Sequence, residues 1–210
     1  MKNKIIEMAK KMAGMIDQIH DIDTKTEVLN EVRKELHKVS PYKDHPVDLV
    51  EWVKSEEVEK NDYNPNTMFP PEFKLLIHSI LKDGFTQPIV TNPEAGIRRI
   101  VDGFHRRKVI VTTEKISNST YCRVPVTSIR KSRNSFADRM ASTIRHNRAR
   151  GIHGIDKMVH IISILKQECE MSDAWIMKNI GMDADELLRL KQVSGIIELF
   201  KDKEFSKSWE

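Results

Sequence analysis

The stretch "LKDGFTQPIVTNPEAGIRRIVDGFHRRKVI" (residues 81–110) decides the fold of this chain. Its first residues complete an amphipathic helix that begins at Pro70, and Gly84 suits the position just after a helix end. "QPIVT" and "IRRIV" then predict two short strands joined by the turn "NPEAG". The second strand runs through Asp-Gly into another helix with a basic first turn. This order of helices and strands predicts an α/β (α+β) fold.

The first turn of that second helix is unusually basic. A helix N-terminus carries a partial positive charge, which disfavours each cation by a few tenths of a kcal/mol. The chain nevertheless places four basic residues there: His105, Arg106, Arg107 and Lys108. Backbone N–H groups at such a terminus bind anions, and Gly103 permits a close approach. Charge-assisted bonds of about 1.5–3 kcal/mol each suit a nucleotide phosphate. The alternative is a solvated basic turn without a ligand.

The segments on either side of this region are helical. Apolar residues at helical spacing predict helices over residues 4–20 and 25–38, with Thr24 and Glu27 as a capping box. Their apolar stripe indicates packing or, less often, an arm that docks a partner. Four more helices are expected after Ser135, over residues 136–146, 155–169, 173–180 and 184–200.

These elements predict three parts. A helical hairpin spans residues 1–45, an α/β domain spans residues 46–135, and a helical region spans residues 136–210.

Composition narrows the class of protein. Of the 210 residues, 39% are hydrophobic and 31% are charged, which describes a polar globular chain. The net charge of +4 is modest, but Arg130–Arg150 holds seven Lys/Arg against one Asp. Cys122 and Cys169 lack metal-type spacing, and no apolar run of about 18 residues or signal peptide is present. We therefore expect a cytoplasmic protein without a membrane span or an all-protein metal site.

The quoted stretch, together with "VEWVKSEEVEKNDYNPN" (residues 50–66), resembles the N-terminal domain shared by ParB partition proteins, sulfiredoxin and free serine kinase. In that superfamily a helix ending in Gly precedes a "QPIVV" strand, here "QPIVT". A strand then leads into a conserved box, here Asp102-Gly103-Phe104-His105-Arg106. The resemblance covers residues 47–155 and implies a ParB/sulfiredoxin-like core of mixed sheet and helices.

A second box supports the resemblance. "TIRHNRARGIHGIDKM" (residues 143–158) is similar to the ParB segment that completes the nucleotide site with the triphosphate and Mg²⁺. The resemblance implies that phosphate is bound at Gly103 and by four side chains: Arg106, Arg107, Asn147 and Arg150. It places Gln87 near the base or ribose. The implied cofactors are Mg²⁺ and either ATP/ADP or CTP.

The departures from the family pattern concern the chemistry. Phe104 stands where sulfiredoxin has its cysteine and ParB has a glutamate, so thiol chemistry is absent and a CTP clamp is less favoured. The Asp-Gly-x-His-Arg order is closer to the serine kinase box, which implies catalytic roles for Asp102, His105 and Arg106. The kinase also uses a glutamate in an earlier loop, for which Glu57, Glu59 and Asp62 are open candidates here.

The C-terminal region has the shape of a helix-turn-helix. Its last helix opens with three carboxylates, Asp183, Asp185 and Glu186, which DNA phosphates would repel. This favours packing or partner docking over sequence-specific reading of DNA. Overall the chain resembles the IbrB-type ParB-like co-activators of bacterial mobile elements, which implies a partner similar to phosphoadenosine-phosphosulfate (PAPS) reductase, called IbrA.

Three functions stay open. One is a nucleotide-dependent phosphotransferase or NTPase centred on Asp102, His105 and Arg106. The second is a DNA-binding transcription regulator in which nucleotide is only a switch. The third is a noncatalytic partner subunit.

Overall fold

The computed structural model describes residues 1–61, 68–94, 96–129, 135–148 and 155–200. The chain divides into two compact units. The first unit comprises Met1–Lys60 and Met68–Ser132, and the second comprises Asn61–Thr67 and Arg133–Glu210.

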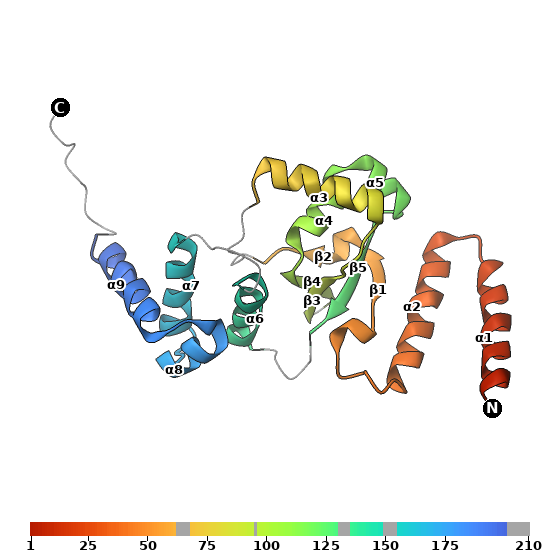
Figure 1. Ribbon diagram of the computed structural model, residues 1–210, viewed down its shortest axis with the longest axis horizontal. Helices are drawn as coiled ribbons and strands as arrows, with labels where there is room; N and C mark the ends of the chain where they lie inside the picture. Colours follow the sequence, from red (N-terminus) through yellow and green to blue (C-terminus); the bar gives the residue numbers. More distant parts are fainter. Residues whose placement is uncertain (62–67, 95, 130–134, 149–154, 201–210) are drawn as a thin grey trace. The chain divides into compact units, whose positions relative to one another are not determined.

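A five-stranded mixed sheet lies at the centre of the first unit (Figure 1). Its strands are β1 (Glu51–Lys54), β2 (Val58–Glu59), β3 (Ile89–Glu94), β4 (Ile97–Asp102) and β5 (Arg123–Ser128). They lie in the order β1-β5-β3-β4-β2. The β3–β4 and β1–β5 pairs are antiparallel, whereas β3–β5 and β2–β4 are parallel. The α/β class expected from the sequence is confirmed.

Two details of the sheet differ from the prediction. Three residues of the expected turn "NPEAG" belong to β3, because Asn92, Pro93 and Glu94 continue the pairing with β4. The segment after β1 contains β2, a two-residue strand that pairs with β4 and that the sequence analysis does not predict. Burial of Val58 in the sheet outweighs the polar residues that surround it in the sequence.

Helices α3 (Pro70–Asp83), α4 (Phe104–Thr112) and α5 (Glu114–Ser119) pack on the sheet (Figure 1). Ile80, Ile110 and Ile116, one from each helix, are buried in a common core with side chains of β3, β4 and β5. Each such burial contributes about 1.5–3 kcal/mol. Gly84 follows α3 with a φ of 73°, as its sequence position predicts. The core therefore fixes β4 and α4, the two elements that form the candidate site.

The predicted N-terminal hairpin consists of α1 (Lys2–Asp17) and α2 (Ile22–Lys38). Helix α2 is attached to the sheet through β1: the Asn30 side chain donates to the Trp52 carbonyl (2.8 Å) and accepts from the Trp52 N–H (3.0 Å). The predicted capping box at Thr24 is wrong. Asp21 is the N-cap, and its Oδ2 accepts from both the Thr24 N–H (2.7 Å) and the Thr24 hydroxyl (2.6 Å).

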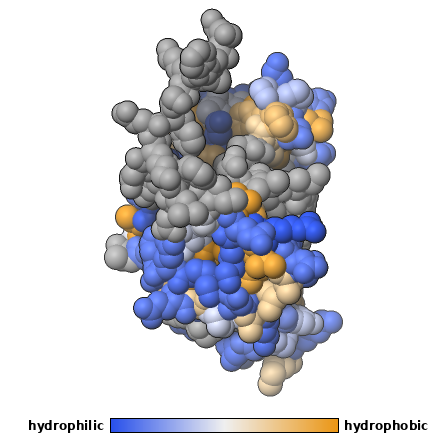
Figure 2. Space-filling view, turned by 90° about the vertical axis from the view of Figure 1, so that its left-hand side faces the viewer, coloured by the Kyte–Doolittle hydropathy of each residue, from blue (hydrophilic) through white to orange (hydrophobic). Residues whose placement is uncertain are grey.

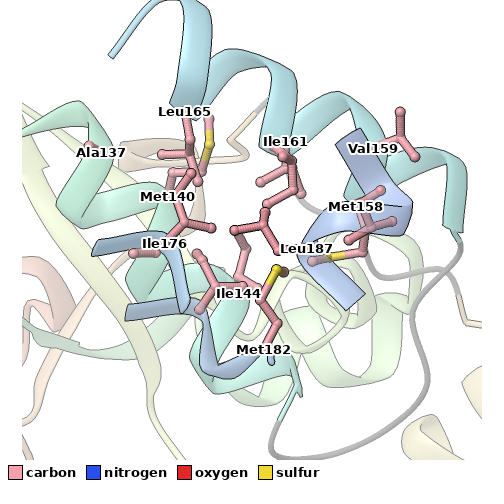
Figure 3. Close-up of a cluster of buried hydrophobic side chains, with 14 residues drawn as sticks. Ala137, Met140, Ile144, Met158, Val159, Ile161, Leu165, Ile176, Met182 and Leu187 are labelled. Carbon is pink, nitrogen blue, oxygen red and sulfur yellow. The ribbon is translucent and has the colours of Figure 1, made fainter. Parts of the chain in front are cut away.

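The second unit is helical, with α6 (Phe136–Arg148), α7 (Ile155–Gln167), α8 (Asp173–Ile176) and α9 (Ala184–Phe200). The expected helix over 173–180 ends at Ile176 and continues as a π-helical turn, η3 (Met177–Gly181). The side chains of Met140, Ile144, Ile161, Leu165 and Ile176 point toward one another in the core of this unit (Figure 3).

The surface on the α8 and α9 side of the molecule is mostly hydrophilic (Figure 2). None of the helices in the described part of the chain combines the length and the apolarity that a bilayer crossing demands.

Candidate anion-binding site at the start of helix α4

The candidate site begins where β4 ends at Asp102 and α4 starts. Gly103 is the N-cap of α4 and has a φ of 100° and a ψ of 20°, a left-handed conformation that favours glycine. The Arg107 N–H donates to the Gly103 carbonyl (3.1 Å) as the first helical bond. Gly103 has no side chain that could cap the helix, and the first turn of α4 contains no acidic residue. The N–H groups of a helix's first turn point away from the helix and are available to an anion.

Arg106 folds back over this turn. Its Nη2 donates to Asp102 Oδ2 (3.1 Å) and to the Pro88 carbonyl (3.2 Å), and its Nη1 donates to Gln87 Oε1 (3.4 Å). The side chain of Arg106 is 16% exposed and that of Asp102 is 9% exposed. Arg106 Nε is buried and has no hydrogen-bond partner among the described residues. The guanidinium is therefore held in place while one of its donors is unused.

The absence of a side chain at Gly103 is what admits Arg106. A Cβ atom at this position would lie 2.8 Å from Arg106 Nη2 and 3.1 Å from Arg106 Cζ. Glycine is thus required both by the backbone conformation and by the neighbouring guanidinium.

The other residues of the basic turn point to different neighbours. Arg107 Nε donates to the Ser55 carbonyl (3.1 Å), and Lys108 Nζ lies 5.1 Å from the centroid of the Phe73 ring. Both of these partners are uncharged, so neither contact pairs the cation with an anion. The His105 ring meets the Phe104 ring edge-to-face, with 5.3 Å between centroids. Phe104 itself packs against the hydrophobic core of the first unit.

Of the residues predicted for the site, the structure brings together Gln87, Asp102, Gly103 and Arg106. Asn147 belongs to α6, in the second unit. Arg150 lies outside the described residues.

Two of the three open candidates for an additional carboxylate, Glu57 and Glu59, lie among the described residues. Glu57 accepts from the Lys54 N–H (3.2 Å), and Glu59 pairs with Arg99 (3.2 Å). Asp62 lies outside the described residues.

The sequence analysis missed two partners of the basic turn. It did not pair Asp102 with Arg106, although a spacing of four residues between Asp and Arg is a known signal for such an ion pair. It also did not foresee the carbonyl groups of Pro88 and Ser55 as acceptors. Backbone carbonyls carry no residue-type signal, so only the fold reveals them.

A polar cavity of the first unit, of about 410 Å³, lies between α2 and β1. Its buried carboxylate, Glu51, is paired with Arg98 (3.0 Å) and Lys34 (3.2 Å). The hydrogen bond of Lys34 with Glu31, and then that with Glu51, raise the pKa of Lys34. The charges of this cavity satisfy one another, so it has the character of a structural ion-pair network.

Among the described residues, no three His, Cys, Asp or Glu side chains gather in the way that would hold a metal ion. At the candidate site, Asp102 would provide one carboxylate ligand to a metal ion. Mg²⁺ is commonly held by one or two carboxylates together with substrate phosphates, so a single carboxylate beside a phosphate site is compatible with Mg²⁺.

In the second unit, a carboxylate at the start of α9 stabilises the N-terminus of that helix. Asp183 Oδ1 accepts from the Glu186 N–H (2.7 Å) and thus caps α9. Asp173 is bound by Lys166 (2.8 Å) and by Lys191 (2.9 Å), which joins α7, α8 and α9. The hydrogen bond from Lys166, and to a smaller extent that from Lys191, holds the pKa of Asp173 below its usual range.

Comparison with known proteins identifies relatives of this chain. Residues 153–202 match the model of the IbrB-like C-terminal helix-turn-helix domain. Over 188 residues the chain is 46% identical to YbdM, an uncharacterized protein of Escherichia coli strain K12, covering 89% of this chain and 88% of that protein.

Two solved structures with similarity to this chain are of the C-terminally truncated chromosome-partitioning protein ParB from Caulobacter crescentus, and both are 17% identical. The first, complexed with CTP-γ-S, gives a TM-score of 0.40 over 72% of this chain and 83% of that chain. The second, complexed to the centromeric parS site, gives a TM-score of 0.46 over 68% of this chain and 70% of that chain. The match of residues 153–202 confirms the IbrB-type resemblance expected from the sequence.

Proposed function

The chain belongs to the same family as YbdM, and we propose that it is a nucleotide-binding protein whose phosphate site is the start of α4. The observation that supports this most strongly is the largely buried Arg106 guanidinium, which is held beside a helix N-terminus where glycine permits a close approach. The proposed ligands are ATP, ADP or CTP with Mg²⁺.

Each residue has a role in this proposal. A phosphate competes with Asp102 for Arg106, while the α4 amides and His105 add further donors. Gln87, which contacts Arg106, lies on the base or ribose side. Asn147, Arg150 and Arg107 supply the remaining phosphate contacts that the ParB resemblance implies. Bound Mg²⁺ would neutralise phosphate charge. Asp102 has two alternative roles, either as a ligand of this Mg²⁺ or as the group that orients the attacking hydroxyl.

The proposed reaction is hydrolysis or transfer of the terminal phosphate. The attacking oxygen of water or of an acceptor hydroxyl forms a bond to phosphorus, and the bond to the bridging oxygen of the leaving nucleotide breaks. Asp102 orients the attacking group and accepts its proton, and Arg106 stabilises charge on the transferred phosphate. His105 donates a hydrogen bond to the same group.

Calorimetric titration with ATP, ADP and CTP in the presence of Mg²⁺ tests the binding site. We expect Arg106→Ala to weaken binding by about tenfold or more, since one charge-assisted bond contributes roughly 1.5–3 kcal/mol. Lys115→Ala is the matched control, because Lys115 is an exposed cation on α5 of the same unit. Equal affinity of the Arg106 variant and the control would refute the site. Asp102→Asn tests the reaction, with retained binding and lost phosphate release as the expected result.

A second candidate function is DNA-binding transcription regulation, with nucleotide acting as a switch. The match of residues 153–202 to a helix-turn-helix domain favours it. Fluorescence anisotropy with duplex DNA at increasing salt measures this, and Arg189→Glu on the exposed surface of α9 should abolish binding. Salt-independent binding, or binding that survives Arg189→Glu, would contradict a role for α9.

We also propose a division of labour among the three parts expected from the sequence. Residues 46–135, together with Asn147 and Arg150, bind nucleotide, and the rest of residues 136–210 binds DNA. The IbrB-type resemblance adds a PAPS-reductase-like partner to this proposal. Co-purification of the two proteins from one host tests the partnership, and separate elution at micromolar concentration would contradict it.

A further inference from the structure

Helix α1 is amphipathic but buries none of its 16 residues. Ile5, Met8, Met12 and Met15 recur at helical spacing on one side and are exposed by 58%, 62%, 36% and 70%. An isolated helix of about this length is only marginally stable in water, and most helices in proteins depend on packing of their apolar face. The apolar face of α1 therefore lacks the cover that would stabilise it.

The hairpin offers an apolar groove beside this face. Figure 1 shows α1 and α2 as antiparallel neighbours at the N-terminal end of the chain. The groove is about 500 Å³ in volume and is lined by Met12 of α1 and by three apolar residues of α2: Val28, Val32 and Leu36. It has room for apolar side chains of another helix.

The charges around the groove indicate what kind of helix fits. Three glutamates of α2, at intervals of four residues, form one row along the groove: Glu27, Glu31 and Glu35. Helix α1 carries Lys4 and Lys11, seven residues or two turns apart, on one edge of its own apolar face. A helix with the sequence of α1 thus brings apolar side chains to the groove and lysines to its acidic edge.

We propose that the occupant is α1 of a second copy of this chain. The contact is reciprocal: each α1 enters the groove of the other copy, and the two hairpins form a four-helix bundle about a twofold axis. Lys4 and Lys11 of each copy then lie beside the glutamate row of the other. The existing Lys34–Glu31 and Lys38–Glu35 pairs are exposed neighbours on one helix, which rearrange at little cost.

The apolar area is sufficient for such a dimer. Six large apolar side chains on this side of the hairpin are more than a third exposed, namely Ile5, Met8, Met12, Met15, Leu36 and Val39. At roughly 100 Å² for each side chain, they offer on the order of 600 Å² per copy, about three quarters of the roughly 800 Å² per partner of a stable interface.

Sedimentation velocity of the full chain over a range of concentrations tests the proposal. We expect a species of twice the 24.4 kDa chain mass, in a concentration-dependent equilibrium with the monomer. Met8→Glu places a charge in the apolar contact and should raise the dimer Kd by about tenfold or more. Far-UV circular dichroism should show helicity that falls on dilution, because α1 loses its cover in the monomer.

Charge reversal separates this arrangement from other dimers. Lys4→Glu and Glu35→Lys should each weaken the dimer, and the double variant should recover it. Lys10→Glu is the matched control, because it makes the same charge change on α1 on the side away from the apolar stripe.

Several results would overturn the proposal. A chain that stays monomeric at roughly 100 μM excludes the second copy as the occupant. A dimer that is unaffected by Met8→Glu and by both charge reversals uses another surface. A monomer that instead sediments with anionic phospholipid vesicles through Met8 would assign this face to a membrane surface.

Discussion

Gly103→Ala is the substitution that examines the candidate site most directly. The backbone φ of 100° costs a non-glycine residue about 1–3 kcal/mol. The new Cβ would also lie 2.8 Å from Arg106 Nη2, so the guanidinium must move away from Asp102. Losing a hydrogen bond to a charged group adds about 1.5–3 kcal/mol. We therefore expect a total destabilisation of about 2.5–6 kcal/mol.

Gly96→Ala separates the two contributions. Gly96 has a φ of 90°, close to that of Gly103, but no atom lies within 4 Å of where its Cβ would be. This control should therefore cost the backbone strain alone, about 1–3 kcal/mol. Urea unfolding followed by far-UV circular dichroism gives both free energies by linear extrapolation.

The same comparison in an Arg106→Ala background isolates the guanidinium. With Arg106 truncated, the clash disappears, and the cost of Gly103→Ala should fall to that of Gly96→Ala. The reasoning is refuted if Gly103→Ala costs no more than Gly96→Ala in the original chain, or if its excess cost survives when Arg106 is absent.

Further substitutions test contacts that lie within one unit or the other. Asn30→Ala leaves both backbone groups of Trp52 without their side-chain partner and should cost about 1–3 kcal/mol in urea unfolding; an unchanged midpoint would contradict this. Because lysine contacts lower the folded-state pKa of Asp173 below its unfolded value of 3.8, its stabilisation is full above pH 3.8 and is lost as the pH falls through the folded pKa. The free energies of unfolding of the original chain and of Asp173→Asn should thus differ by less than about 1 kcal/mol at neutral pH and converge in acid. Ile144→Ala removes a fully buried side chain and should cost about 2–5 kcal/mol, whereas Leu188→Ala, 53% exposed, should stay within about 0.5 kcal/mol.

The sequence predicts much of the fold because its signals are local. Pro70 and Gly84 mark the ends of α3, and apolar periodicity identifies α6, α7 and α9. What it does not predict depends on long-range pairing. Strand β2 exists because Val58 and Glu59 pair with β4, some forty residues later in the chain, and two residues carry too little pattern to show this.

The candidate site was predictable in its residue types but not in its contacts. Asp102, Gly103 and Arg106 lie together as their positions in one box imply. The direction of each basic side chain depends on neighbours that come from elsewhere in the chain. Ser55 binds Arg107 and Phe73 lies under Lys108, and both of these neighbours precede the basic residue that they contact by more than thirty residues.

The bond between Asn30 and Trp52 has a consequence for how copies of this chain meet. Strand β1 lies at one edge of the sheet, where free peptide groups are a template for another strand and thus for aggregation. The Asn30 amide satisfies both peptide groups of Trp52, at the middle of that edge, in the way a neighbouring strand would. The side chain therefore closes this edge against sheet extension, and association through the N-terminal hairpin proceeds through helix faces without the risk of a growing β-ribbon.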